Sequence, residues 1–197
     1  MENGDVLMPE KDSRQRAERV KMIIMDVDGT LTDGTLLLLP DGEEVKSYNV
    51  LDGLGILLAH MAGIKTGIIT GKFSKPLAKR AKNLKVIELY QGILDKKKVL
   101  QEILEKHNLH REDVAYIGDD LGDLDVIKEV GFAGAVANAH TIIKKHSHYH
   151  CRLEGGKGAV REFIEFILTV QDKWDIIQDN ITNIKGNPEL EQTIIGQ

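Results

Sequence analysis

Two acidic pairs stand directly after apolar runs of the chain. Asp26 and Asp28 follow the run at 22–25, and Asp119 and Asp120 end a second such run. A short apolar run without polar alternation predicts a strand buried on both faces, so each pair should lie where a strand opens into a loop. Crowded carboxylates are costly unless a cation or a proton neutralises them. The pattern therefore indicates a metal-dependent acid/base site.

Two further polar side chains adjoin strand-like runs. Thr70 ends a run that begins at residue 64, and Lys96 opens a helical segment after a run at 86–90. The ends of parallel strands share one edge of a sheet, so these residues can converge with the aspartates. One carboxylate can attack phosphorus while a second acts as general acid and then as base. A hard cation, a hydroxyl and an ammonium can stabilise the phosphoryl oxygens, so the set suits phosphoryl transfer through an acyl phosphate.

The composition is that of an ordinary globular domain. The 197 residues are 42% hydrophobic and 29% charged, which fits one domain with its own core. A net charge of −5 argues against a general nucleic-acid binder, and no apolar run is long enough to span a bilayer. The single cysteine, Cys151, excludes a disulfide framework within the chain. We therefore expect a cytoplasmic protein without nucleic-acid or membrane partners.

Strand-like runs alternate with helical segments along most of the chain. The five main runs lie at 22–25, 64–69, 86–90, 114–118 and 132–136. This alternation predicts an α/β fold with a doubly wound parallel sheet. A helix capped by Asp52 is expected after the first run, and a closing helix at about 159–170. The domain should span 20–170, between a partly disordered tail at 1–19 and a second tail at 171–197.

One insertion interrupts the alternation. The segment 35–48 carries two strand-like runs around a Pro-Asp-Gly turn, which predicts a β-hairpin. The leucines at 36–39 are too apolar for water, so they pack on the sheet or, as we favour, against another subunit. The segments around Thr70 leave no room for a cap domain. An enzyme without a cap must accept macromolecules or close its site with another subunit, and the hairpin favours the second.

The order of these motifs resembles the haloacid dehalogenase superfamily of phosphatases, and within it the capless 3-deoxy-D-manno-octulosonate 8-phosphate phosphatase branch. The similar stretches are DVDGTLTDG at 26–34, GIITG at 67–71, QGILDK at 91–96 and GDDLGD at 118–123. The resemblance covers roughly residues 20–165. It implies the Rossmann-like haloacid dehalogenase fold with a hairpin insertion and no cap domain. It also implies Mg²⁺ as cofactor and a homotetramer built through the 35–48 hairpin.

The resemblance assigns catalytic roles. Asp26 matches the family's nucleophile and Asp28 its general acid/base, while Thr70 and Lys96 match the residues of the second and third motifs. Taken alone, the aspartates are compatible with turn or helix capping, and the three lysines from Lys96 with a solvated charged face. Capping does not explain a second acidic pair at the end of another strand.

The resemblance also implies the metal ligands. Mg²⁺ would be bound by Asp26, Asp119 and the backbone carbonyl of Asp28. Asp120 would support this site through water or through the lysine of the third motif. Asp123, the last residue of the fourth motif, is expected to cap or orient its neighbours.

Five residues are expected to bind the substrate, namely Thr30, Gly71, Lys72, Lys157 and Arg161. The glycine-rich turn at 155–158 resembles the branch's C-terminal signature, with Lys157 or Arg161 meeting a sugar-acid carboxylate. By itself the turn is also compatible with an ordinary helix start. Leu51 departs from the pattern, because the octulosonate enzymes typically carry arginine there. Lys72 keeps their basic character, whereas enzymes for nine-carbon ketoacid 9-phosphates tend to have glutamate.

The preferred interpretation is a Mg²⁺-dependent phosphatase of 3-deoxy-D-manno-octulosonate 8-phosphate, in lipopolysaccharide sugar synthesis. The alternative substrate is a nine-carbon 2-keto-3-deoxy sugar acid 9-phosphate. A signalling protein that holds an aspartyl phosphate without turnover fits less well in motif order, and a silent scaffold conflicts with the complete acid set. A transition-metal site of His146, His148 and His150 with Cys151 is possible if they share a strand face, although edge strands commonly carry polar residues.

Overall fold

A computed structural model describes residues 11–182 of the protein. Its main sheet has six strands in the order β5-β4-β1-β6-β7-β8, and every neighbouring pair is parallel. The strands are β1 (Met22–Met25), β4 (Lys65–Ile69), β5 (Glu88–Tyr90), β6 (Val114–Gly118), β7 (Phe132–Ala135) and β8 (Tyr149–His150). The predicted doubly wound α/β fold is confirmed.

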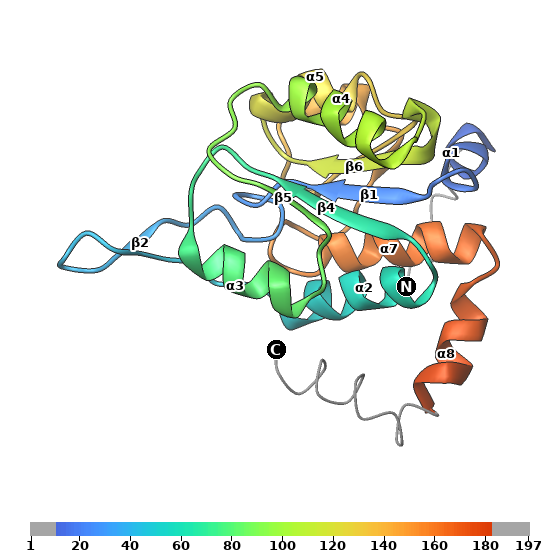
Figure 1. Ribbon diagram of the computed structural model, residues 1–197, viewed down its shortest axis with the longest axis horizontal. Coiled ribbons are helices and arrows are strands. Elements are labelled where there is room, and N and C mark those ends of the chain that lie inside the picture. Colours follow the sequence, from blue (N-terminus) through green and yellow to red (C-terminus); the bar gives the residue numbers. More distant parts are fainter. Residues whose placement is uncertain (1–10, 183–197) are drawn as a thin grey trace, which may run out of the picture.

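Helices cover both faces of this sheet (Figure 1). On one face lie α4 (Lys96–His107) and α5 (Leu124–Ile127), and on the other lie α2 (Val50–Met61), α3 (Lys75–Asn83) and α7 (Ala159–Val170). The remaining helical segments are α1 (Lys11–Ala17), α6 (Thr141–His146), α8 (Trp174–Thr182) and the 3₁₀ turns η1 (Arg111–Asp113) and η2 (Leu121–Asp123). All four residues of β1 are buried, which explains why the sequence of this strand shows no polar alternation.

The strand order reverses beside β1. After β1 the chain forms β4 and β5 on one side of it, and then crosses back to form β6, β7 and β8 on the other. Ligands of open α/β sheets bind at the carboxyl ends of the strands where the order reverses. The register pairs Met25 of β1 with Ile117 of β6, so the residues that follow these two strands emerge side by side.

The predicted hairpin is formed by β2 (Leu37–Leu38) and β3 (Glu44–Val45), which pair antiparallel. In Figure 1 it projects away from the body of the protein. The leucines at 36–39 are 44–63% exposed, so they do not pack on the sheet of their own chain. A solvent-facing apolar ribbon of this kind indicates a binding surface.

The prediction that Asp52 caps α2 is wrong. Asn49 caps this helix, because its side chain accepts a hydrogen bond from the backbone N–H of Leu51 at 2.8 Å. Asp52 is buried in the first turn of α2, and its Oδ1 accepts from the N–H of Arg161 at 2.9 Å. Asp52 therefore lies at the N-terminus of α7, where the unpaired N–H groups and the helix dipole stabilise a carboxylate.

The two expected tails are only partly described. Residues 11–17 form α1, and α8 packs against α7. Residues 1–10 and 183–197 lie outside the described part, and so do the predictions that concern them. Between residues 11 and 182, none of the helices is both long and apolar enough to cross a bilayer.

Candidate active site

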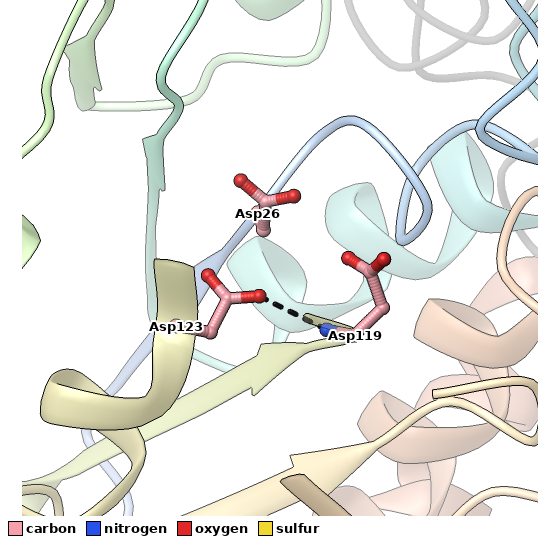
Figure 2. A group of neighbouring side chains, drawn as sticks. All are labelled: Asp26, Asp119 and Asp123. Atoms are coloured by element: carbon pink, nitrogen blue, oxygen red, sulfur yellow. Dashed lines mark hydrogen bonds between the residues drawn. The ribbon is translucent and has the colours of Figure 1, made fainter. Parts of the chain in front are cut away.

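Three carboxylates meet at the carboxyl edge of the sheet. Asp26 follows β1, Asp119 follows β6, and Asp123 lies in η2 just beyond it. One oxygen of each lies within 4.8 Å of the others (Figure 2). The backbone N–H of Asp26 donates to the carbonyl of Ile117 at 3.1 Å, which extends the β1–β6 pairing up to the first carboxylate. The predicted convergence of the first and fourth motifs is therefore observed.

Burial and mutual repulsion disfavour the charged forms of two of these acids. Burial raises the pKa of Asp26 to about 7, together with the charge of Asp123 and against the effect of Lys96. Burial also raises the pKa of Asp119 to about 7, with the charges of Asp26 and Asp123 adding to the shift. A hard cation bound to oxygen ligands would remove this repulsion, so the donor set fits Mg²⁺.

Lys96 is the buried cation beside this cluster. It is the first residue of α4, which Asp95 caps by accepting from the N–H of Lys98. Its Nζ donates to Asp26 Oδ1 at 2.5 Å and to Asp123 Oδ1 at 2.7 Å. Burial alone would lower the pKa of Lys96, but the two carboxylates outweigh it and raise the pKa. The ammonium therefore stays charged and fixes the orientation of Asp26.

Asp123 accepts hydrogen bonds from several residues in and around the fourth motif. Its Oδ1 also accepts from the hydroxyl of Tyr116 at 2.5 Å, and its Oδ2 accepts from the N–H of Asp119 at 3.0 Å and of Asp120 at 3.3 Å. With Lys96, four donors occupy its two oxygens. Asp123 thus orients its neighbours, as expected. Its place three residues after the N-cap Asp120 is the capping-box spacing, a signal readable in the sequence.

Asp120 does not contact Lys96, one of the two ways in which it was expected to support the metal site; its support through water stays a prediction. Asp120 is exposed, and its side chain accepts from the N–H of Leu121 at 2.8 Å. Lys96 pairs with Asp123 instead. The two residues differ because η2 turns the side chain of Asp123 inward, whereas that of Asp120 caps the start of the turn.

Thr30 was expected to bind substrate, and in the structure its hydroxyl contacts a carboxylate of the site. Its side chain is buried, and its hydroxyl donates to Asp119 Oδ1 at 3.0 Å, so it orients this carboxylate. Gly29 just before it has φ +93°, and a Cβ there would lie 2.0 Å from Asp119 Oδ2. The loop after β1 therefore passes directly against Asp119, which only glycine permits at position 29.

The second motif lies at the end of the neighbouring strand. Thr70 follows β4, is buried, and accepts a hydrogen bond from the N–H of Lys72 at 3.4 Å. Gly71 and Lys72 are exposed. The Nζ of Lys72 lies 3.9 Å from Glu44 Oε2 of the hairpin. The motif therefore adjoins both β1 and the base of the hairpin.

Asp28 has a partner that the sequence did not single out. Its Oδ1 accepts a short hydrogen bond from the Nζ of Lys46, which follows β3 of the hairpin. The same Nζ lies 2.8 Å from Glu44 Oε1. The only sequence signal is that residues 44 and 46 share one face of a strand.

The glycine-rich turn at 155–158 packs against the loop after β1. The N–H of Gly156 donates to the carbonyl of Thr30 at 2.9 Å, and Asn49 Nδ2 donates to the carbonyl of Gly156 at 3.2 Å. A Cβ on Gly155 would lie 1.7 Å from the carbonyl oxygen of Gly29. The turn is therefore more than a helix start, because it supports the loop that carries the first motif.

The two basic residues expected near a substrate carboxylate differ in placement. Lys157 is largely exposed, and its Nζ lies 3.8 Å from Asp33 Oδ2 in the loop after β1. Arg161 forms a short ion pair with Glu165, and its guanidinium carbon lies 5.4 Å from the centre of the Trp174 ring. The helical phase of α7 thus directs Arg161 toward α8. That Arg161 binds substrate stays a prediction.

The histidines do not form a metal site. His148 Nδ1 accepts from the N–H of Ala133 at 2.9 Å, His150 Nε2 donates to the carbonyl of Lys144, and His146 ends α6. Cys151 is a buried thiol. In the described part of the chain, Asp26, Asp119 and Asp123 are the one group of three or more such ligands close enough for a metal ion.

Comparisons with known proteins agree with this geometry. A family model for haloacid dehalogenase-like hydrolases matches residues 66–164. The 3-deoxy-D-manno-octulosonate 8-phosphate phosphatase KdsC of Yersinia pestis is 44% identical over 162 residues, 82% of this chain and 87% of that one. The Escherichia coli K12 protein of the same name is 42% identical over 81% of this chain and 85% of its own.

Solved structures extend the similarity to the fold. The octulosonate 8-phosphate phosphatase of Moraxella catarrhalis, in complex with magnesium ion, phosphate ion and KDO, is 37% identical with a TM-score of 0.85, covering 87% of this chain and 99% of that one. The cobalt-bound Haemophilus influenzae phosphatase is 36% identical with a TM-score of 0.80, covering 82% and 95%.

Proposed function

This chain belongs to the haloacid dehalogenase-like hydrolases, and we propose that it is a Mg²⁺-dependent phosphatase of 3-deoxy-D-manno-octulosonate 8-phosphate. The products are the free sugar acid and phosphate. The observation that carries this proposal is the cluster of Asp26, Asp119 and Asp123 beside Lys96, in a chain 44% identical to an octulosonate phosphatase.

Asp26, Asp119 and the backbone carbonyl of Asp28 would bind the magnesium ion. The raised pKa values of Asp26 and Asp119 support this assignment, because burial and the neighbouring carboxylates disfavour their charged forms, which a bound cation would stabilise. Asp123 is a poorer ligand, because both of its oxygens already accept hydrogen bonds. Bound there, the ion would neutralise part of the charge that otherwise repels an approaching phosphate.

Two covalent steps follow from the proposed roles. A carboxylate oxygen of Asp26 attacks phosphorus, the bond from phosphorus to the sugar oxygen breaks, and Asp28 gives that oxygen its proton. Water then attacks the phosphorus of the aspartyl phosphate, Asp28 takes the water proton, and Asp26 leaves as a carboxylate. Lys96 holds Asp26 in place for both steps. The hydroxyl of Thr70, at the adjacent strand end, is suited to a phosphoryl oxygen.

We infer a homotetramer in which the 35–48 hairpin contacts other subunits. The exposed leucines support this, as does the lack of a cap domain among residues 11–182. A neighbouring subunit would then exclude water from the site. Cys151 is a buried thiol, which is compatible with the cytoplasmic location that we infer for the enzyme.

Fewer residues support the assignment of the substrate than support the assignment of the reaction. Lys72 places a positive charge near the second motif, which supports the eight-carbon sugar acid. Leu51 is half exposed beside the glycine-rich turn, where a Cβ on Gly158 would lie 3.8 Å from its Cδ1. Because leucine stands at position 51 where the octulosonate enzymes typically carry arginine, the nine-carbon 2-keto-3-deoxy sugar acid 9-phosphate is the second candidate substrate.

The test is phosphate release with Mg²⁺ or EDTA from the octulosonate 8-phosphate, a nine-carbon ketoacid 9-phosphate and a hexose phosphate. We expect release that needs Mg²⁺ and is fastest with the eight-carbon ester. Preference for the nine-carbon ester would retain the chemistry and change the substrate. A stably phosphorylated Asp26 without release would point to the signalling alternative.

A further inference from the structure

Lys46 lies at the base of the hairpin with its side chain turned toward the catalytic loop. The side chain is only 5% exposed, although Lys46 directly follows β3 of the hairpin, which projects away from the body of the protein. Its ammonium contacts two carboxylates, Oδ1 of Asp28 and Oε1 of Glu44. Withdrawing a lysine side chain from water is costly without such partners. The ion pairs of Lys46 with Asp28 and Glu44 are therefore part of the packed structure and differ from an exposed surface ion pair.

This contact belongs to a row of alternating charges. Asp28, Lys46, Glu44 and Lys72 follow one another, and the last pair is 3.9 Å apart. The row joins three segments that are distant in the sequence, namely the loop after β1, the hairpin and the loop after β4. It therefore connects the proposed acid/base with the hairpin and with the second motif.

The side chain of Asp28 is 31% exposed, so packing alone does not fix its orientation. Within residues 11–182, Lys46 is the one side chain that donates a hydrogen bond to this carboxylate. The ammonium occupies Oδ1. The other oxygen, Oδ2, is then left to carry the proton that moves to the leaving sugar oxygen and later returns from water.

We infer that Lys46 is a positioning residue that holds Asp28 for proton transfer to the leaving group. The inference rests on the proposed phosphatase function, in which Asp28 is the general acid/base. In this role Lys46 acts through Asp28 and not directly on phosphorus or the leaving oxygen. Its loss should therefore affect a reaction in proportion to how much the leaving group needs a proton.

The test compares two esters on the same enzyme preparation. The octulosonate 8-phosphate has an alkoxide leaving group that needs a proton, whereas p-nitrophenyl phosphate releases a stable anion. For Lys46→Met we expect kcat/KM to fall by on the order of 10²-fold with the first ester and by only about threefold with the second. Lys46→Arg, which keeps the charge, should recover most of the loss.

A matched control is Lys21→Met, which removes a lysine paired with Asp113 at 2.9 Å at the opposite edge of the sheet. We expect it to leave both values of kcat/KM unchanged. In an Asp28→Asn background, Lys46→Met should cause no further loss, because its effect passes through Asp28.

Equal losses on the two esters, or a full added loss in the Asp28→Asn background, would overturn the inference. The ratio of the two rates is independent of how much protein is folded, so a less stable variant still gives an answer. The wild-type rates report on the proposed function separately. An active wild type with an unchanged ratio in Lys46→Met would refute only the role of Lys46, whereas a wild type inactive on both esters would refute the phosphatase function and this role with it.

Discussion

Replacing Gly155 by alanine tests whether the glycine-rich turn sets the position of the catalytic loop. The added Cβ would lie 1.7 Å from the carbonyl oxygen of Gly29 and 3.2 Å from the Cα of Thr30. Nonbonded contacts between a carbon and an oxygen need about 3 Å or more, so the turn or the loop must move by roughly 1 Å. The loop carries Asp28, and Thr30 orients Asp119.

We expect two consequences of Gly155→Ala. A misplacement of about 1 Å at catalytic groups should lower kcat/KM by on the order of 10²-fold. Overpacking between two buried backbone segments should lower the free energy of unfolding by about 1–3 kcal/mol. Phosphate release under Mg²⁺ and urea denaturation measure these two quantities.

The matched control is Gly122→Ala in η2, where an added Cβ meets no atom within 4 Å. It lies next to Asp123 in sequence, yet we expect activity and stability close to those of the wild type. If Gly155→Ala behaves like Gly122→Ala in both assays, the turn does not position the loop and the reasoning fails.

Three further predictions concern the nucleophile, the metal and the hairpin. Asp26→Asn should lower phosphate release by at least about 10³-fold, and normal turnover would exclude Asp26 as the nucleophile. The pKa values of Asp26 and Asp119 are raised to about 7 in the folded protein. Between pH of about 4 and 7 the folded protein therefore binds more protons than the unfolded chain. In EDTA, its free energy of unfolding should thus fall as the pH rises through this window. Mg²⁺ should therefore raise the melting temperature more at pH 8 than at pH 5, and an equal shift would contradict the assignment of these carboxylates. Leu37→Ser with Leu38→Ser should reduce the mass in solution, measured by light scattering, and an unchanged mass would refute the hairpin interface.

The positions of the main groups proposed to be catalytic could be predicted from local patterns. An unalternating apolar run indicates a strand buried on both faces, and parallel strands end at a common edge. Asp26 and Asp119 meet for this reason, although 92 residues lie between them in the chain. The turn residues around position 41 similarly predicted the hairpin that β2 and β3 form.

Which way each side chain points was decided by the tertiary structure. Asp120 and Asp123 are both acids of one motif, but η2 turns only Asp123 toward Lys96. Arg161 follows the glycine-rich turn closely, yet the phase of α7 directs it to Glu165 and Trp174. Such outcomes depend on which element packs against a given face, and no local spacing contains that information.

The contacts between distant segments were likewise decided only on folding. Asp52 has the residue type and place of a helix cap, but it lies at the N-terminus of α7, more than 100 residues further along the chain. In the sequence, Lys46 is simply a polar residue of a predicted hairpin. Only in the folded chain does its ammonium donate a hydrogen bond to Asp28. Propensity and periodicity act over a few residues, so they determined the elements of this protein and the ends where its acids stand. The partners of those acids depend on packing between elements, and the tertiary structure alone determined them.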